Sequence, residues 1–95
     1  SISAGLDYPG VSPIHCFVKD TKRARYTYAT DEDALNAHVM VTKYENLNPS
    51  LEPSHAFAEA IKIAPKLSKD TIIIVNSCGD AKKDRDILRE RLGKR

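Results

Sequence analysis

The chain has 95 residues and a net charge of +2, with 41% hydrophobic and 29% charged residues. This length allows at most one small domain with a thin core, and the composition excludes a disordered or fibrous chain. The longest uninterrupted apolar run covers only residues 72–75, far below the ~18 to 20 residues that cross a bilayer. We therefore expect no membrane span, and the N-terminus lacks the pattern of a secretory signal.

The basic residues are concentrated near the C-terminus. Residues 81–95 contain seven Lys or Arg against three Asp or Glu, which leaves eight against ten in the rest of the chain. Because acidic residues are interleaved and no aromatic residue lies among them, a solvated helix face explains this tail better than a nucleic-acid site. A nucleic-acid binder that uses residues 82–95 is the least favoured alternative.

Two cysteines, Cys16 and Cys78, are too few for a disulfide scaffold, so reduced thiols in a cytoplasmic protein are expected. A zinc site would need closely spaced ligand pairs, and only His15 and Cys16 are neighbours. The sequence therefore favours no metal site of this kind.

Residues 1–13 are predicted to be a loop, because glycines and prolines interrupt any regular element there. Residues 15–19 fit a short helix or a short strand equally well. Residues 24–29 are rich in aromatic and β-branched side chains, which predicts a strand. Thr30 can then cap a helix over residues 31–45, where three carboxylates occupy the first turn and apolar residues follow at helical spacing.

A second helix is predicted from Ser54, which can cap it, to about Ala64, since a proline follows. Residues 71–75 form a β-branched run without polar alternation, typical of a strand covered on both faces in a parallel sheet. A turn over residues 76–80 and a last helix over residues 83–92 complete the chain.

The order strand, helix, helix, strand, turn, helix over residues 24–92 predicts an α/β architecture, a partial parallel sheet with flanking helices. Two strands do not make a stable sheet alone, so the strand at residues 71–75 requires neighbours that this chain does not contain. We therefore expect the chain to be part of something larger.

Candidate chemistry lies first in the turn of residues 76–80, because ligands bind beyond the carboxyl ends of parallel strands. Its backbone N–H groups, hydroxyl and thiol suit a polar ligand atom, although a purely structural turn is the simpler interpretation. Simple structural interpretations also exist for three other candidates: Glu52 can be a helix-start residue, His55 a packed histidine, and Asp7 a turn residue.

Three segments together resemble one family. Residues 1–13, Ser-Ile-Ser-Ala-Gly-Leu-Asp-Tyr-Pro-Gly-Val-Ser-Pro, are similar to the Ser-x-Ser-Ala-Gly-Leu-Asp-Tyr-Pro-Gly-Val-Gly-Pro stretch of the tryptophan synthase beta subunit. Residues 48–56, Asn-Pro-Ser-Leu-Glu-Pro-Ser-His-Ala, resemble that family's Ile-Pro-Ala-Leu-Glu-Ser-Ser-His-Ala. Residues 74–84, Ile-Val-Asn-Ser-Cys-Gly-Asp-Ala-Lys-Lys-Asp, resemble its Val-Val-Asn-Leu-Ser-Gly-Arg-Gly-Asp-Lys-Asp. The resemblance covers essentially the whole chain, as the C-terminal segment of the family.

The resemblance implies a three-layer α/β/α enzyme of fold-type II that uses pyridoxal 5′-phosphate. Such a lyase condenses L-serine with indole to give L-tryptophan and water, in tryptophan biosynthesis. The cofactor serves as the electron sink, while the protein orients it and tunes its ring nitrogen. The implied partners are the preceding part of the beta subunit, a second beta subunit and an alpha subunit, with no nucleic acid and no membrane.

The resemblance also assigns roles in the loop of residues 1–13. Asp7 corresponds to the aspartate that meets the hydroxyl of the substrate serine, and Gly5 lies along the substrate pocket. Tyr8 and Gly10 correspond to positions whose backbone carbonyls line a monovalent-cation site.

Further along the chain, Glu52 corresponds to the glutamate near the cofactor ring. Cys78 corresponds to the serine that hydrogen-bonds the pyridine nitrogen, with Gly79 beside it, whereas a shift of one residue would put Ser77 in that role. In the gap-free alignment Asp80 replaces an arginine, which reverses a charge beside the cofactor.

Two catalytic parts of the family, the lysine that forms the Schiff base and the glycine-rich phosphate loop, precede the segment that this chain resembles. The four glycines of the chain never cluster into such a loop, so the isolated chain is expected to be inactive. The alternative is a stand-alone, non-catalytic remnant that binds a partner chain. Such a module should have replaced exposed apolar residues by polar ones, because large exposed apolar patches mark interfaces.

Overall fold

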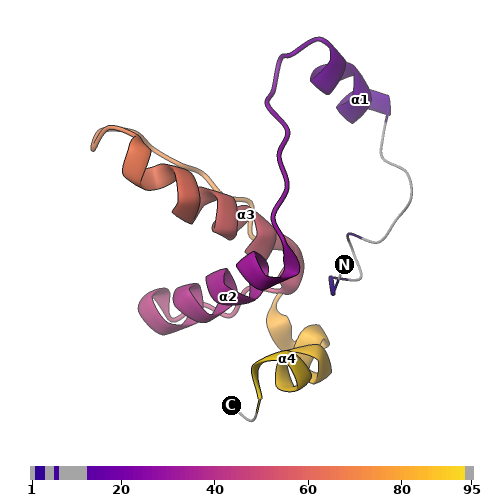
Figure 1. The fold of residues 1–95 in the computed structure, drawn as a ribbon, viewed down its shortest axis with the longest axis vertical. Coiled ribbons are helices and arrows are strands. Elements are labelled where there is room, and N and C mark those ends of the chain that lie inside the picture. Colours follow the sequence, from indigo (N-terminus) through magenta and orange to yellow (C-terminus); the bar gives the residue numbers. More distant parts are fainter. Residues whose placement is uncertain (1, 4–5, 7–12, 94–95) are drawn as a thin grey trace.

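A computed structural model describes residues 2, 3, 6 and 13–93 of the chain (Figure 1). In chain order these residues form α1 (Pro13–Asp20), α2 (Asp31–Glu45), α3 (Leu51–Ile63), the 3₁₀ helices η2 (Ala64–Lys66) and η3 (Ala81–Asp84), and α4 (Arg85–Leu92). None of the helices in this part of the chain has the length and apolar character needed to cross a membrane.

Helix α2 begins where the sequence predicts. The Thr30 side chain accepts a hydrogen bond from the backbone N–H of Asp33 at 3.1 Å, and the Asp33 carboxylate accepts one from the backbone N–H of Thr30 at 3.2 Å. This reciprocal pair is a capping box, which satisfies two N–H groups that have no partner within the helix. The helix ends at Asn46, whose φ of 54° is left-handed.

Helix α3 begins earlier than predicted. Ser50 occupies the N-cap position and Leu51 is the first helical residue, so the prediction that Ser54 caps this helix is wrong. Pro53 is tolerated because the N–H groups of a first helical turn have no partner within the helix. The Ser54 hydroxyl instead donates to the Ser50 carbonyl at 2.7 Å.

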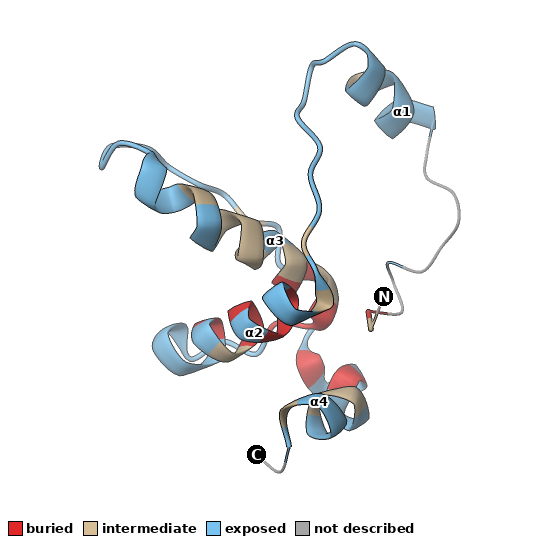
Figure 2. Ribbon diagram, in the orientation of Figure 1, coloured by how far each residue is buried: buried red, intermediate tan, exposed pale blue. Residues whose placement is uncertain are grey.

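The segment at residues 15–19, which fits a helix or a strand, is helical. Helix α1 starts at Pro13, a position where proline's fixed φ suits the helix and its missing N–H costs nothing. No residue of α1 is buried, and the helix lies apart from α2 and α3 (Figures 1 and 2).

Neither predicted strand, at residues 24–29 or 71–75, is seen in the described part of the chain. Residues 25–30 and 71–78 have no regular secondary structure, and the only β-type pairing among the described residues is one antiparallel bridge between Pro49 and Asp80. A strand is stabilised by hydrogen bonds to a neighbouring strand, which these segments lack. The described part of the chain is therefore helical, and the predicted parallel sheet of an α/β fold is not seen.

The last predicted helix is present and ends at Leu92, but it starts as the 3₁₀ helix η3 before continuing as α4. Asp80 is the N-cap, and its carboxylate accepts a hydrogen bond from the backbone N–H of Lys82 at 2.9 Å. The Asp80 carboxylate thus has a local structural partner.

The core lies where α2 packs on the beginning of α3, with η3 beside it (Figure 2). Its apolar members are small or few, as expected for a short chain: Ala34, Leu35, Ala37, Val41, Leu51 and Ala81. By contrast, both cysteine thiols are exposed and unbridged.

Candidate functional site

The turn of residues 76–80 packs against the segment that joins α2 to α3. The backbone N–H of Ala81 donates to the Asn48 carbonyl at 3.0 Å, next to the bridge between Pro49 and Asp80. The Ser50 hydroxyl donates to the Cys78 carbonyl at 2.9 Å. These contacts hold the turn on the N-terminus of α3.

Gly79 allows this close approach. Its φ of +76° lies in the left-handed region, and a Cβ atom built on it would lie 3.5 Å from the Ser50 hydroxyl oxygen. That distance is ordinary contact, so the backbone conformation, and not crowding, is what favours glycine here.

The buried carboxylate of Asp84 connects η3 to the start of α3. Asp84 is only 3% exposed, and its Oδ2 accepts a hydrogen bond from the backbone N–H of Leu51 at 2.9 Å. This N–H belongs to the first turn of α3, where the helix dipole also favours a negative charge. The Lys83 ammonium lies 3.3 Å from the Asp84 Oδ1.

Glu52 and Lys83 form the central ion pair of the site. The Lys83 Nζ lies 2.7 Å from Oε1 and 2.8 Å from Oε2 of Glu52. The Glu52 side chain is 19% exposed and that of Lys83 is 50% exposed. The hydrogen bond to Glu52 raises the pKa of the Lys83 ammonium, against the opposing effect of desolvation, so this ammonium is charged at neutral pH.

Two histidines fix the segments around the turn. The His38 Nδ1 lies 2.9 Å from the Pro49 carbonyl, and the His55 Nδ1 lies 2.7 Å from the Leu51 carbonyl. The His55 Nε2 is 4.0 Å from the Asp31 carboxylate at the start of α2. His55 is therefore packed within the fold, in line with its sequence interpretation.

The structure brings together those predicted site residues that it describes. Glu52 lies in the first turn of α3, and the turn that contains Ser77, Cys78 and Gly79 packs against the N-cap of the same helix. The other predicted site residues, Gly5, Asp7, Tyr8 and Gly10, lie outside the described residues.

Sequence reasoning missed three residues of this site: Ser50, Lys83 and Asp84. Their partners lie 28, 31 and 33 positions away in the chain, so no local pattern could have paired them. One signal in the sequence could have indicated Ser50. Serine is a common N-cap residue, and Pro53, three positions later, is tolerated in the first turn of a helix.

Comparison with curated proteins gives long, continuous matches. The chain is 54% identical over 92 residues to the tryptophan synthase beta chain of Fusobacterium nucleatum subsp. nucleatum, which covers 97% of this chain and 23% of that protein. It is 52% identical over 93 residues to the corresponding chain of Bordetella petrii and 50% identical over 93 residues to that of Cereibacter sphaeroides. This chain is homologous to a segment of the tryptophan synthase beta chain.

The resemblance read from three sequence motifs is thereby confirmed over nearly the whole chain. The chain spans about a quarter of the length of these tryptophan synthase beta chains, 23% in each of the three cases. No model of a known protein family matches the sequence.

Proposed function

We propose that this chain is the C-terminal part of a tryptophan synthase beta subunit, which uses pyridoxal 5′-phosphate to condense L-serine with indole into L-tryptophan and water. The observation that carries this proposal is that the turn of residues 76–80 packs on the N-cap of α3, the helix whose first turn contains Glu52. The sequence resemblance assigns both segments to the surroundings of the cofactor ring. A shared site requires that these two segments lie side by side.

The turn fits one edge of the cofactor. Ser77 and Cys78 are exposed and offer a hydroxyl and a thiol, either of which can donate a hydrogen bond to the ring nitrogen. The Ser50 hydroxyl holds the Cys78 carbonyl, which fixes the backbone from which these side chains project. We assign the ring-nitrogen contact to Cys78, with Ser77 as the alternative, and a thiol makes this contact weaker because it is a poorer donor.

When bound, the cofactor supplies the electron sink of the reaction. Glu52 would supply an oriented carboxylate beside it. Both of its carboxylate oxygens contact the Lys83 ammonium, which orients the carboxylate, and a carboxylate oxygen can accept a proton or a hydrogen bond from a reacting group.

The loop of residues 1–13 completes the proposed site. Asp7 would accept a hydrogen bond from the hydroxyl of the substrate serine, and Gly5 would line the substrate pocket. The carbonyls of Tyr8 and Gly10 would bind a monovalent cation, since backbone oxygens suit such ions. The Schiff-base lysine and the phosphate loop would come from the preceding part of the subunit, with a second beta subunit and an alpha subunit as partners.

Exposed apolar residues favour this proposal over a stand-alone remnant. Ile72 is 86% exposed and Ile74 is 90% exposed, in the run for which the sequence predicts a strand covered on both faces. A stand-alone, partner-binding module would have polar residues at such positions. The run is better explained as one that pairs with the rest of a larger subunit.

The proposal is tested first on the intact gene product. We expect an antibody against this chain to detect, in an extract of the source organism, a protein several times heavier than 10.6 kDa. The purified protein, supplied with pyridoxal 5′-phosphate, should form L-tryptophan from L-serine and indole. A native product of 10.6 kDa would instead support the stand-alone remnant.

In that protein, Glu52→Ala should alter the ratio of products more than the affinity for L-serine, because the carboxylate is proposed to direct protons near the cofactor. Glu59→Ala removes a carboxylate from the same helix and should leave the product ratio unchanged. Product ratios are measured by chromatography after reaction with L-serine and indole. An unchanged ratio in Glu52→Ala would reject the assigned role.

A further inference from the structure

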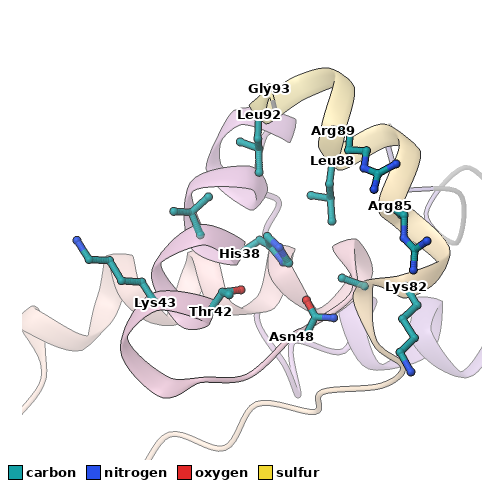
Figure 3. Close-up of a pocket in the computed structure, with 12 residues that line it drawn as sticks. His38, Thr42, Lys43, Asn48, Lys82, Arg85, Leu88, Arg89, Leu92 and Gly93 are labelled. Carbon is teal, nitrogen blue, oxygen red and sulfur yellow. The ribbon is translucent and has the colours of Figure 1, made fainter. Parts of the chain in front are cut away.

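A pocket lies between α2 and α4. It is a pocket of about 490 Å³ with walls from α2, the segment after it, and η3 with α4; its main lining residues are His38, Val39, Asn48, Arg85, Leu88 and Leu92 (Figure 3). Its volume is in the range of small-molecule sites, ~300 to 1,000 Å³. Neither Glu52 nor any residue of the turn of residues 76–80 lines it, so it is separate from the proposed cofactor site.

The pocket has an apolar surface on both helices. Leu88 and Leu92 are four residues apart on α4, so they lie on one face of that helix. Val39 contributes from α2. These side chains can cover the flat body of a ring.

His38 is a pre-oriented polar group in this pocket. It is only 7% exposed, and its Nδ1 is held by the Pro49 carbonyl at 2.9 Å. Because a carbonyl oxygen can only accept a hydrogen bond, the Nδ1 of His38 carries the hydrogen. In the neutral ring, Nε2 is then the nitrogen that can accept a hydrogen bond. The ring points from α2 into the pocket, toward Leu88 (Figure 3).

Positive charge lines the α4 side of the pocket. Arg85 and Arg89 are four residues apart on α4 and both line it. Within residues 13–93, neither guanidinium takes part in an ion pair. Lys43 and Lys82 lie at the edges, with their ammonium groups directed away from the pocket (Figure 3). No carboxylate lines the pocket, so its potential favours an anion.

We propose that this pocket binds a small organic acid with an apolar ring. The ring packs against Leu88, Leu92 and Val39. The carboxylate pairs with Arg85 and Arg89, since a guanidinium matches a carboxylate in both charge and geometry. This binding site is independent of the proposed catalytic reaction, because it uses neither the cofactor nor the turn.

The test is binding of 2-naphthoate, with the neutral 2-naphthylmethanol as its matched probe. Titration of the full chain, followed by amide chemical shifts, should perturb His38, Asn48 and Leu88. The intact gene product, titrated by calorimetry, should bind 2-naphthoate at the same site. Because guanidinium contacts at an open pocket are partly screened, we expect the neutral probe to bind roughly fivefold more weakly.

The double variant Arg85→Gln with Arg89→Gln should lose this preference for the anion. Arg91→Gln removes one charge from the same helix at a position that does not line the pocket, and should leave binding unchanged; circular dichroism verifies that both variants keep the helices. Equal binding of the two probes, or equal loss in Arg91→Gln, would refute the proposal. Binding to the chain but not to the intact gene product would also refute it, and would show that another segment of the subunit fills the pocket. None of these outcomes depends on tryptophan formation.

Discussion

The ion pair between Lys83 and Glu52 is the contact that most directly joins the two halves of the proposed cofactor site. Lys83 also lies 3.3 Å from Asp84, so one ammonium serves two carboxylates on two elements. Asp84 is 3% exposed, whereas the Glu52 side chain is 19% exposed. The two carboxylates therefore differ in how much the fold depends on them.

Replacing Lys83 by Gln should lower stability only slightly, by less than ~1 kcal/mol, because solvent screens a half-exposed pair. The pKa of Lys83 is raised above its usual value of 10.5 in the folded chain. The stability that the charged Lys83 ammonium provides is therefore fully present below about pH 10.5. It is lost as the pH rises through the higher pKa that Lys83 has in the folded chain. Denaturation followed between pH 7 and 11 measures this.

Lys82→Gln is the control for that variant, because the Lys82 contact to Asp80 is made by its backbone N–H and survives the change. The Lys82→Gln variant should lose stability at high pH as the unchanged chain does, whereas the Lys83→Gln variant should not show this loss. Equal pH profiles for the two variants would contradict the assigned role of Lys83.

Asp84→Ala should be the more damaging change. It leaves the buried N–H of Leu51 without its acceptor, and an unsatisfied buried donor costs about 1 to 3 kcal/mol. Asp86→Ala removes an exposed carboxylate from the first turn of α4 and should cost much less. Urea denaturation compares the two, and similar losses would count against a structural role for Asp84.

At the scale of elements, α2 is set by interactions within its own first turn. Thr30 and Asp33 cap each other, and the sequence predicted this helix with the same bounds. The predicted start of α3 at Ser54 is wrong because the first turn of a helix accommodates proline, so the helix begins at Leu51, before Pro53.

Removing the cap of α2 by Thr30→Ala should lower stability by about 1 kcal/mol. Hydrogen bonds from Thr30 hold the pKa of Asp33 below its usual 3.8. The part of the cap made by the ionised Asp33 carboxylate is thus present above about pH 4 and is lost as the pH falls through the lowered value, whereas the bond from the Asp33 N–H to the Thr30 hydroxyl does not titrate. Thermal denaturation at pH 7 and pH 3 should show a smaller difference in Thr30→Ala than in Thr42→Ala, which alters a threonine of the same helix away from its cap. Equal differences would argue against the capping box.

At the scale of the whole molecule, the described residues bury few apolar side chains, and a β-branched run remains in solvent. Ile72 and Ile74 are almost fully exposed. A run of this kind is stable as a strand only between other strands and under helices. The exposed run is consistent with a chain that completes its fold with other residues.

Ile72→Lys combined with Ile74→Lys should therefore have opposite effects in two contexts. The isolated chain should keep its helical circular dichroism and aggregate less, because exposed β-branched runs promote association. The intact gene product should lose stability or fail to fold, since the proposed strand would carry charges into a covered sheet. Ile14→Lys, on the exposed helix α1, should have no such effect, and a stable double variant of the gene product would overturn the proposed covered strand.

The sequence by itself determined the features that depend on neighbours in the chain. Helix α2 and the end of α4 follow from capping residues and apolar spacing within a few positions, and the motifs that contain Glu52 and Cys78 identified the homology. Only the tertiary structure decided what lies side by side. Glu52 meets Lys83 across 31 positions and Leu51 meets Asp84 across 33, and the predicted strands at residues 24–29 and 71–75 remain unpaired in the described chain. Helices satisfy their hydrogen bonds locally, whereas strands and ion pairs require partners that local sequence does not specify.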